Sequence, residues 1–160
     1  YALVGHSERR AYFNESPEDL AGKLMRCLEN NLIPVYCVGE ELSDRKTGNY
    51  LNVIDAQIKA VLFGLNTKDL NNIIVAYEPI WAIGTGETAS AEQAQEVHAF
   101  IRNLLANKFG ASGSDISILY GGSCKPSNSE ELFSQPDIDG GLIGAAALNA
   151  QDFIAIANSF

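Results

Sequence analysis

The sequence predicts an α/β fold in which helices cover a parallel sheet, and two observations support this prediction. Short runs rich in β-branched, aromatic and other apolar residues recur along the chain at residues 1–4, 33–38, 73–77, 116–120 and 141–143. Segments with the periodicity of amphipathic helices lie between these runs. Strands that are almost continuously apolar and alternate with helices are typical of parallel sheets, which are covered on their faces.

Each longer predicted helix has a recognisable start and an apolar face. Ser16 suits the N-cap position before Pro17, and Ser90 forms a capping box with Gln93. Asn149 opens the last helix, and residues 126–134 suit a short one. The apolar faces comprise Leu20, Leu24, Met25 and Leu28; Leu51, Ile54, Ile58, Val61, Leu62 and Leu65; Ala94, Val97, Ile101, Leu104 and Leu105; and Phe153, Ile156 and Phe160.

The carboxyl ends of the predicted strands favour a barrel over an open doubly wound sheet. All five end in small or reactive residues, at positions 5–8, 39–40, 78–79, 121–123 and 144. A barrel gathers all its strand ends at one rim, whereas an open sheet uses mainly its switch point. A closed barrel has eight strand-helix units, so we predict an incomplete (β/α) barrel of about five units, with about three absent. No linker divides the chain, which predicts one domain over residues 1–160.

Composition and charge narrow the classes of partner. No apolar run reaches the ~18 residues that span a membrane, so we expect a cytoplasmic protein. The formal net charge of −9 argues against nucleic acids and anionic membranes as partners. An anionic ligand would have to be held by backbone N–H groups and helix N-termini. The chain starts inside an apolar run at Tyr1, which we interpret as part of a longer sequence.

The three cysteines, Cys27, Cys37 and Cys124, are odd in number and share no C-x-x-C spacing. This pattern makes a disulfide framework or a zinc site improbable. We therefore expect reduced thiols that mostly fill the core, and no metal.

The segment AYEPIWAIGTG, residues 76–86, raises the question of a nucleotide site or a lid. Residues 84–89 satisfy G-x-G-x-x-A, but residues 79–83 intervene after the preceding strand, and the next helix begins only after Ser90. A dinucleotide fingerprint needs its first glycine directly after the strand and a helix inside the motif. The better interpretation is a hinged loop, stiffened by Pro79 and Trp81, whose tip closes over a ligand.

Glu78 and His6 are the candidates for acid-base chemistry. Apolar neighbours would desolvate Glu78, raise its pKa and make it a stronger base. The alternative is a rim glutamate paired with a cation. His6 follows a strand end and precedes a helix start, where the helix dipole favours a neutral imidazole, although Glu8 acts in the opposite direction. A structural role is the alternative for His6, and it is the role we assign to His98, which we place on the outer face of its helix.

Small residues follow the last two strands, at Gly121-Gly122-Ser123 and at residues 142–146. Their backbone N–H groups can converge on an anion, and (β/α) barrels frequently bind phosphate in their last two strand-end loops. The alternative is that these glycines only permit tight turns.

Together these segments resemble the triosephosphate isomerase family. GHSERR at 5–10, CVGE at 37–40, AYEPIWAIGTG at 76–86, ILYGGS at 118–123 and GLIGAAAL at 141–148 match its motifs in order and approximate spacing. The resemblance spans the whole chain, from the family's fourth strand to its last helix. It implies part of a TIM barrel that lacks strands one to three, and an enzyme of glycolysis and gluconeogenesis.

The resemblance also implies roles for individual residues. The implied reaction interconverts dihydroxyacetone phosphate and glyceraldehyde 3-phosphate without a cofactor, in a homo-oligomer or with a complementing N-terminal segment. Glu78 matches the base, His6 the neutral imidazole that polarises the carbonyl, and Glu8 a nearby carboxylate. Gly84, Ser123, Gly144 and Ala145 match the residues that bind the phosphate. The closing loop includes Pro79, Trp81, Ile83, Thr85 and Gly86. Tyr120 matches the residue that holds this loop closed.

Two departures from the family pattern leave other functions open. Ala145 stands where the family commonly has glycine, and the N-x-K motif that brings the catalytic lysine is absent from this sequence. One alternative is therefore an inert half-barrel that binds phosphate or self-associates. Another is a barrel enzyme that acts on a different phosphosugar.

Overall fold

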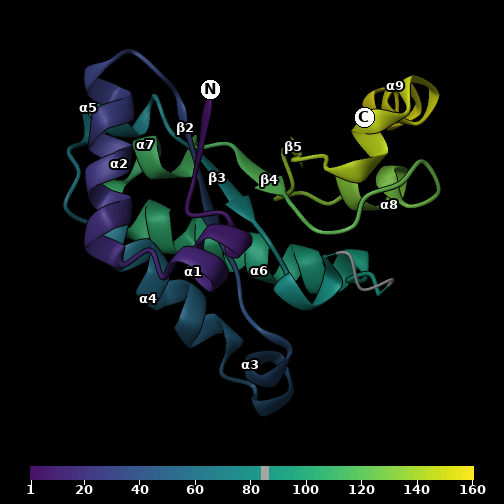
Figure 1. Ribbon diagram of the computed structural model, residues 1–160, viewed down its shortest axis with the longest axis horizontal. Coiled ribbons are helices and arrows are strands. Elements are labelled where there is room, and N and C mark those ends of the chain that lie inside the picture. The colour runs from purple at the N-terminus through teal and green to yellow at the C-terminus, as the bar shows by residue number, and fades with distance from the viewer. Residues whose placement is uncertain (84–86) are drawn as a thin grey trace.

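The computed structural model describes residues 1–83 and 87–160, in which five parallel strands form one sheet (Figure 1). The strands are β1 (Ala2–Val4), β2 (Pro34–Val38), β3 (Ile74–Tyr77), β4 (Ile118–Tyr120) and β5 (Gly140–Gly141). Each strand pairs with the next one along the chain, so the order β1-β2-β3-β4-β5 contains no switch point. This order is that of a barrel wall and confirms the predicted α/β fold with five parallel units of a partial barrel.

The strand positions follow the predicted apolar runs, with small shifts at the ends. All five residues of β2 are buried, as expected for a strand covered on both faces. The last strand is shorter and earlier than residues 141–143. The chain leaves the ladder after Gly141, and the Leu142 N–H makes one more bond of 2.8 Å to the carbonyl of Tyr120.

The main helices pack against one another in chain order along the sheet. Figure 1 shows α2, α4 and α6 on one side, with α8 and α9 at the end farthest from α2, and α2 contacts α4, α4 contacts α6 and α6 contacts α8. The α-helices are α1 (Ser7–Phe13), α2 (Pro17–Glu29), α3 (Leu42–Thr47), α4 (Tyr50–Leu62), α5 (Thr67–Leu70), α6 (Ala91–Phe109), α7 (Ala111–Ser114), α8 (Ser129–Phe133) and α9 (Ala150–Ala157); η1 (Ile80–Ala82) and η2 (Ala145–Leu148) are 3₁₀ turns.

The predicted helix starts are confirmed by their caps. The Ser16 and Ser90 side chains each accept a hydrogen bond from the N–H of the third helical residue, and each serine's own N–H donates to the side chain of that residue, which completes a capping box at both sites. Asn149 accepts from the N–H groups of Gln151 and Asp152 at the start of α9. These side chains satisfy N–H groups that have no partner within the helix.

The apolar faces of α2 and α6 differ from the prediction at one residue each. Leu20 and Leu24 are fully buried, but Met25 is 40% exposed because the inward stripe follows positions three and four apart. His98 is fully buried, so its predicted outer-face position is wrong. It lies four residues after Ala94 and three before Ile101, which puts it on the inward stripe of α6.

The contacts of His98 are nevertheless those of a structural residue in the core. Its ring centroid lies 5.7 Å from that of Tyr77, at an angle of 83°, and its Nδ1 lies 3.2 Å from the Asp137 carbonyl oxygen. Burial lowers the pKa of His98 to about 4. A buried, neutral histidine is therefore part of the core between α6 and the sheet.

Arg102 of α6 holds the segment that leads into β5. Its guanidinium lies 2.8 Å from a carboxylate oxygen of Asp137 and 2.8 Å from one of Asp139. The same Asp139 carboxylate accepts from the Ile118 N–H at 2.6 Å. These bonds tie α6 to the beginning of β4 and to the residues before β5, which fixes the approach to the last strand-end loop.

The cysteine prediction is confirmed, because all three thiols are buried and none forms a disulfide in the part of the chain that is described. Burial raises the pKa of Cys37 and that of Cys124, the latter to about 11, so both stay protonated at neutral pH. Across residues 1–83 and 87–160, no helix has the length and apolar character needed to cross a membrane, and no cluster of metal-ligating side chains occurs.

Candidate active site

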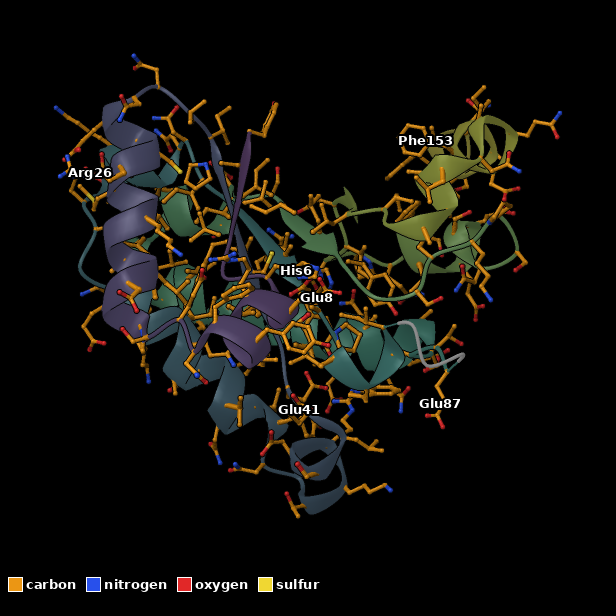
Figure 2. All side chains as sticks on the ribbon, in the orientation of Figure 1. His6, Glu8, Arg26, Glu41, Glu87 and Phe153 are labelled. Carbon is orange, nitrogen blue, oxygen red and sulfur yellow. The ribbon has the colours of Figure 1, made fainter. Side chains whose placement is uncertain are left out.

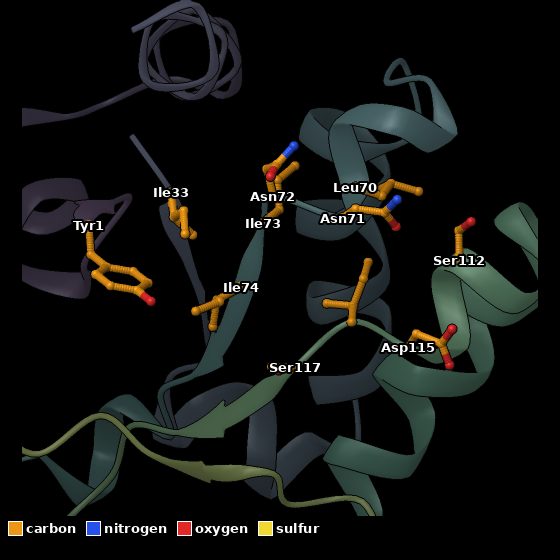
Figure 3. A pocket seen from close by; sticks show the side chains of 11 residues that line it. Tyr1, Ile33, Leu70, Asn71, Asn72, Ile73, Ile74, Ser112, Asp115 and Ser117 are labelled. Atoms are coloured by element: carbon orange, nitrogen blue, oxygen red, sulfur yellow. The ribbon is translucent and has the colours of Figure 1, made fainter. Parts of the chain in front are cut away.

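Two hollows lie at opposite ends of the strands, and their linings differ in chemistry. The one at the amino ends has a volume of about 180 Å³ and lies between Tyr1, Ile33 and Ile74 (Figure 3). Further apolar side chains, together with asparagine, serine and Asp115 side chains, complete its described lining, which holds no histidine, lysine or arginine. The cavity at the carboxyl ends contains both His6 and Glu78. It is therefore the candidate site for acid-base chemistry.

His6 and Glu78 lie side by side although they follow different strands. The His6 Nε2 atom is 3.0 Å from Oε1 of Glu78. His6 comes after β1 and Glu78 directly after β3, and both of these strands pair with β2. Because parallel strands present their carboxyl ends at the same edge, the topology brings the two residues together.

The turn between β1 and α1 sets the orientation of the His6 ring. His6 is the N-cap of α1, where Figure 2 shows it next to Glu8, and its Nδ1 accepts a hydrogen bond from the Glu8 N–H at 3.3 Å. An Nδ1 atom that accepts a hydrogen bond carries no proton, so Nε2, which faces Glu78, is the ring nitrogen that can donate. The neutral imidazole itself stays a prediction.

Glu78 is almost completely buried and its two carboxylate oxygens have different partners. Oε1 faces His6, and Oε2 accepts from the Ser7 N–H at 3.0 Å. Burial raises the pKa of Glu78, whereas His6, the Ser7 N–H and Arg10 oppose that rise. The pKa of Glu78 is therefore raised, as predicted from its apolar neighbours. A raised pKa makes Glu78 a stronger base than an exposed glutamate.

Glycines on both neighbouring strands leave space for Glu78. A Cβ atom on Gly39, after β2, would lie 1.8 Å from the Glu78 carbonyl oxygen, and one on Gly121, after β4, would lie 3.0 Å from Glu78 Cγ. The Glu78 N–H donates to the Val38 carbonyl at 2.7 Å. Its backbone is thus held tightly, and a larger residue on either side would displace it.

The cavity also collects most of the described residues that the resemblance assigns to phosphate. It has a volume of about 620 Å³, and Ser123, Gly144 and Ala145 line it together with His6 and Glu78. Gly144 and Ala145 are exposed at the start of η2, whereas the Ser123 N–H donates to the Ala82 carbonyl at 3.2 Å. Gly144 and Ala145 are therefore accessible to a ligand. For the Ser123 N–H, a ligand would have to compete with the Ala82 carbonyl.

The beginning of the predicted lid is anchored to a buried glutamate. Pro79 precedes the η1 turn, where Trp81 Nε1 donates to Glu40 Oε1 at 2.9 Å. The Tyr77 hydroxyl donates to the same oxygen at 3.0 Å. Burial raises the pKa of Glu40, and these two donors oppose that rise. Ile83 reaches the cavity, whereas the predicted lid and phosphate residues Gly84, Thr85 and Gly86 lie outside the described residues.

Tyr120 and Glu8 have surroundings that the sequence did not indicate. Tyr120 is fully buried, and its hydroxyl has no hydrogen-bond partner among the described residues. Burial raises its pKa to about 12, although the nearby Ala89 N–H opposes the rise. The hydroxyl therefore faces the far end of the lid loop. Glu8 is exposed, and its main-chain N–H is the group that contacts His6.

Three further residues belong to the site but were not selected from the sequence. Lys125 and Asp152 line the cavity, and Arg10 lies behind Glu78. Lys125 shares a loop with Ser123, which could have indicated its position. Asp152 was recognised only as part of a helix start, and nothing in the sequence pattern distinguishes Arg10 from Arg9.

These features define a class of protein: a partial (β/α) barrel with a buried carboxylate and an imidazole at the carboxyl ends of its strands. The family model described as triosephosphate isomerase matches residues 1–160. The chain therefore belongs to the triosephosphate isomerase family.

Relatives from several bacteria carry that description. The chain is 56% identical to the triosephosphate isomerase of Phocaeicola vulgatus and 53% identical to that of Bacteroides fragilis, in each case over 100% of this chain and 64% of the relative. It is 54% identical to the enzyme of Cytophaga hutchinsonii, with the same coverage. The chain thus spans about 64% of the length of these relatives.

Proposed function

We propose that this chain supplies the base, the imidazole and most of the phosphate site of an enzyme that interconverts dihydroxyacetone phosphate and glyceraldehyde 3-phosphate. The observation that carries the proposal is the contact between His6 Nε2 and Glu78 Oε1 over a cavity that Gly144 and Ala145 also line. Membership in the triosephosphate isomerase family supports the choice of substrate.

The proposed reaction is a proton transfer between adjacent carbons. Glu78 removes a proton from the carbon next to the carbonyl, and the electron pair of that bond moves to form an enediolate. His6 Nε2–H, which now points at Glu78, donates instead to the substrate oxygen as charge develops on it. The proton of the hydroxyl group on the deprotonated carbon passes through His6 to the oxygen that was the carbonyl. Glu78 returns the carbon proton to the former carbonyl carbon, so that the new carbonyl forms on the carbon that was deprotonated. The base is regenerated, and no cofactor is needed.

The phosphate must be held without help from the overall charge, because the chain carries a net −9. We assign the grip to the backbone N–H groups of Gly84, Ser123, Gly144 and Ala145. Closure of the loop from Pro79 to Ala89 would exclude water and suppress loss of phosphate. In the proposal Trp81 anchors the beginning of this loop and Tyr120 latches its end.

The absent lysine limits what these 160 residues achieve alone. Loss of one donor to an oxyanion costs about 2.7–4 kcal/mol, or roughly a hundredfold to a thousandfold in rate. We therefore expect full activity only when an N-x-K segment is present, and we expect that active form to be a cytoplasmic homo-oligomer.

A coupled assay of triose phosphate interconversion tests the proposal. It compares the intact protein, residues 1–160 alone, and the Glu78→Gln variant of each. The proposal requires turnover by the intact protein that the substitution lowers about a hundredfold or more. A decrease of less than about tenfold in Glu78→Gln would disprove the assigned base.

A second candidate is an inert module that binds phosphate, since the exposed Gly144 and Ala145 line the cavity. Calorimetry with inorganic phosphate distinguishes it, because that module would bind phosphate while the intact protein shows no turnover. Sedimentation of the same samples reports self-association.

A further inference from the structure

Arg10 of α1 connects the carboxyl ends of two strands beneath the candidate site. Its Nε donates to the Gly5 carbonyl at 2.8 Å, and its Nη2 donates to the Cys37 carbonyl at 2.8 Å. Gly5 follows β1, whereas Cys37 belongs to β2. We propose that Arg10 is a positioning residue for Glu78, because its guanidinium ties the turn of residues 5–7 to β2. The inference rests on the proposed role of Glu78 as the base.

The geometry requires a planar, forked donor. A guanidinium can bond two carbonyl oxygens on separate strands at once, whereas a lysine ammonium is a point charge on a flexible stem. The close approach also depends on Gly5, whose φ is +76° and whose Cβ, if present, would lie 3.1 Å from Arg10 Nη2. The turn and the arginine are therefore fitted to each other.

The tied turn carries both groups that bind the Glu78 carboxylate. The Ser7 N–H donates to Oε2, and His6 Nε2 faces Oε1. The turn follows β1, which has only three residues and, within the described part of the chain, pairs on one side only, with β2. The two hydrogen bonds from Arg10 therefore add a tie between this turn and β2 beyond the β1–β2 pairing.

Arg10 also acts on Glu78 through its charge. The ionisable groups that face Glu78 are His6, Glu8 and Arg10 from the α1 segment and Cys37 from β2, while Lys125 and Asp152 line the same cavity from the other side. Among the described groups that act on the carboxylate, Arg10 is the permanent cation. Its charge lowers the pKa of Glu78 and that of Cys37. Arg10 therefore opposes the rise in the pKa of Glu78 that burial causes.

Arg9 is a matched control on the same helix. Its Nε lies 2.6 Å from Oε1 of Glu15, and its guanidinium stacks over the Phe13 ring at 4.3 Å. These contacts hold no strand end, and Arg9 does not appear among the groups that act on Glu78. Replacing Arg9 with methionine therefore changes the charge of α1 by the same amount as replacing Arg10, but it leaves the hydrogen bonds from Arg10 to Gly5 and Cys37 in place.

The experiment uses Arg10→Met, Arg10→Lys and Arg9→Met in the intact protein without substrate. Carbon-13 NMR of the glutamate carboxyls follows the Glu78 titration, and amide exchange follows Ser7. Arg10→Met should raise the Glu78 midpoint and speed Ser7 exchange about tenfold or more. Arg10→Lys should speed Ser7 exchange to a similar extent, because lysine lacks the forked guanidinium. It should raise the Glu78 titration midpoint less than Arg10→Met does, because it keeps the positive charge. Arg9→Met should change neither.

The inference is overturned if the Arg10 variants fold with the wild-type midpoint and the wild-type Ser7 exchange, even if their thermal stability falls. Equal effects from Arg9→Met would overturn it too. If Arg10→Met fails to fold, Arg10→Lys decides the question through the exchange of Ser7. Since neither measurement involves substrate, the result is separate from the isomerase assay, which can fail without affecting it.

Discussion

The Nε2 atom of His6 lies 3.0 Å from the Oε1 atom of Glu78, and both residues line the cavity at the carboxyl ends of the strands. The imidazole hydrogen is therefore already directed into the cavity, and the buried carboxylate is its present acceptor. Binding of a carbonyl compound would exchange one acceptor for another without reorienting the ring. Such preorganisation is how fixed donors stabilise developing charge.

Removal of either member of this pair should abolish most of the activity. We expect Glu78→Gln to lower kcat about 10²- to 10⁴-fold, as for loss of a general base, and His6→Gln to lower it about 10²- to 10³-fold. Steady-state kinetics of the intact protein measures both. Glu18→Gln, at an exposed position in the first turn of α2, is the control and should keep wild-type kinetics.

The raised pKa of Glu78 should appear in the pH profile of kcat/KM. Only the ionised carboxylate accepts a proton, so activity should fall as the pH drops through a midpoint above the ordinary value of 4.5. A profile whose acid limb lies at or below that value would contradict the assignment of burial as the dominant influence.

The same shift has a consequence for stability. Between pH 4.5 and the raised pKa, native Glu78 holds a proton that the unfolded chain has released, so the free energy of unfolding decreases as the pH rises through that window. Glu78→Gln cannot titrate and should lack this decrease. Urea denaturation at a series of pH values measures the difference, which should grow with pH and then level off.

Gly39 and Gly22 should respond oppositely to alanine. At Gly39 a Cβ would lie 1.8 Å from the Glu78 carbonyl oxygen, so we expect Gly39→Ala to cost more than about 3 kcal/mol, the upper end for overpacking. Gly22 lies exposed within α2 and has nothing within 4 Å of the same position. Gly22→Ala should therefore stabilise the protein by about 0.5–1 kcal/mol. Denaturant unfolding tests both.

Tyr77 and Tyr120 form a second matched pair, since they are register partners on β3 and β4 and both are fully buried. Tyr77 donates to the Glu40 carboxylate at 3.0 Å, whereas the Tyr120 hydroxyl has no hydrogen-bond partner among the described residues. Tyr77→Phe should cost about 1.5–3 kcal/mol. Tyr120→Phe should be close to neutral, and an equal loss at both sites would show that packing around the ring dominates.

Ala145→Gly tests the departure from the family's glycine. The substitution keeps the backbone N–H but removes a methyl group from the cavity lining. We expect tighter binding of inorganic phosphate by less than tenfold, which corresponds to less than about 1.4 kcal/mol. Isothermal titration measures it, with Ala147→Gly in the same turn as control. Weaker binding in Ala145→Gly would indicate that the alanine orders the turn.

By itself, the sequence determined the elements and the motifs. Alternation of apolar runs and helical stripes predicts the five parallel strands, and local capping by Ser16, Ser90 and Asn149 predicts where three helices begin. The strand-end residues, Glu78 and His6 among them, could be assigned to one rim because parallel topology gathers them there. These predictions succeeded because they depend on interactions between residues close in sequence or on a single topological rule.

Only the tertiary structure decided which groups touch. It placed His98 in the core rather than on the surface, because the choice depends on which stripe of α6 meets Tyr77. It showed that the Ser123 N–H donates to the Ala82 carbonyl. It also distinguished Arg10, which donates to carbonyls at two strand ends, from Arg9, which donates to Glu15. Burial and hydrogen-bond geometry depend on distances between segments far apart along the chain, and no local pattern specifies those distances.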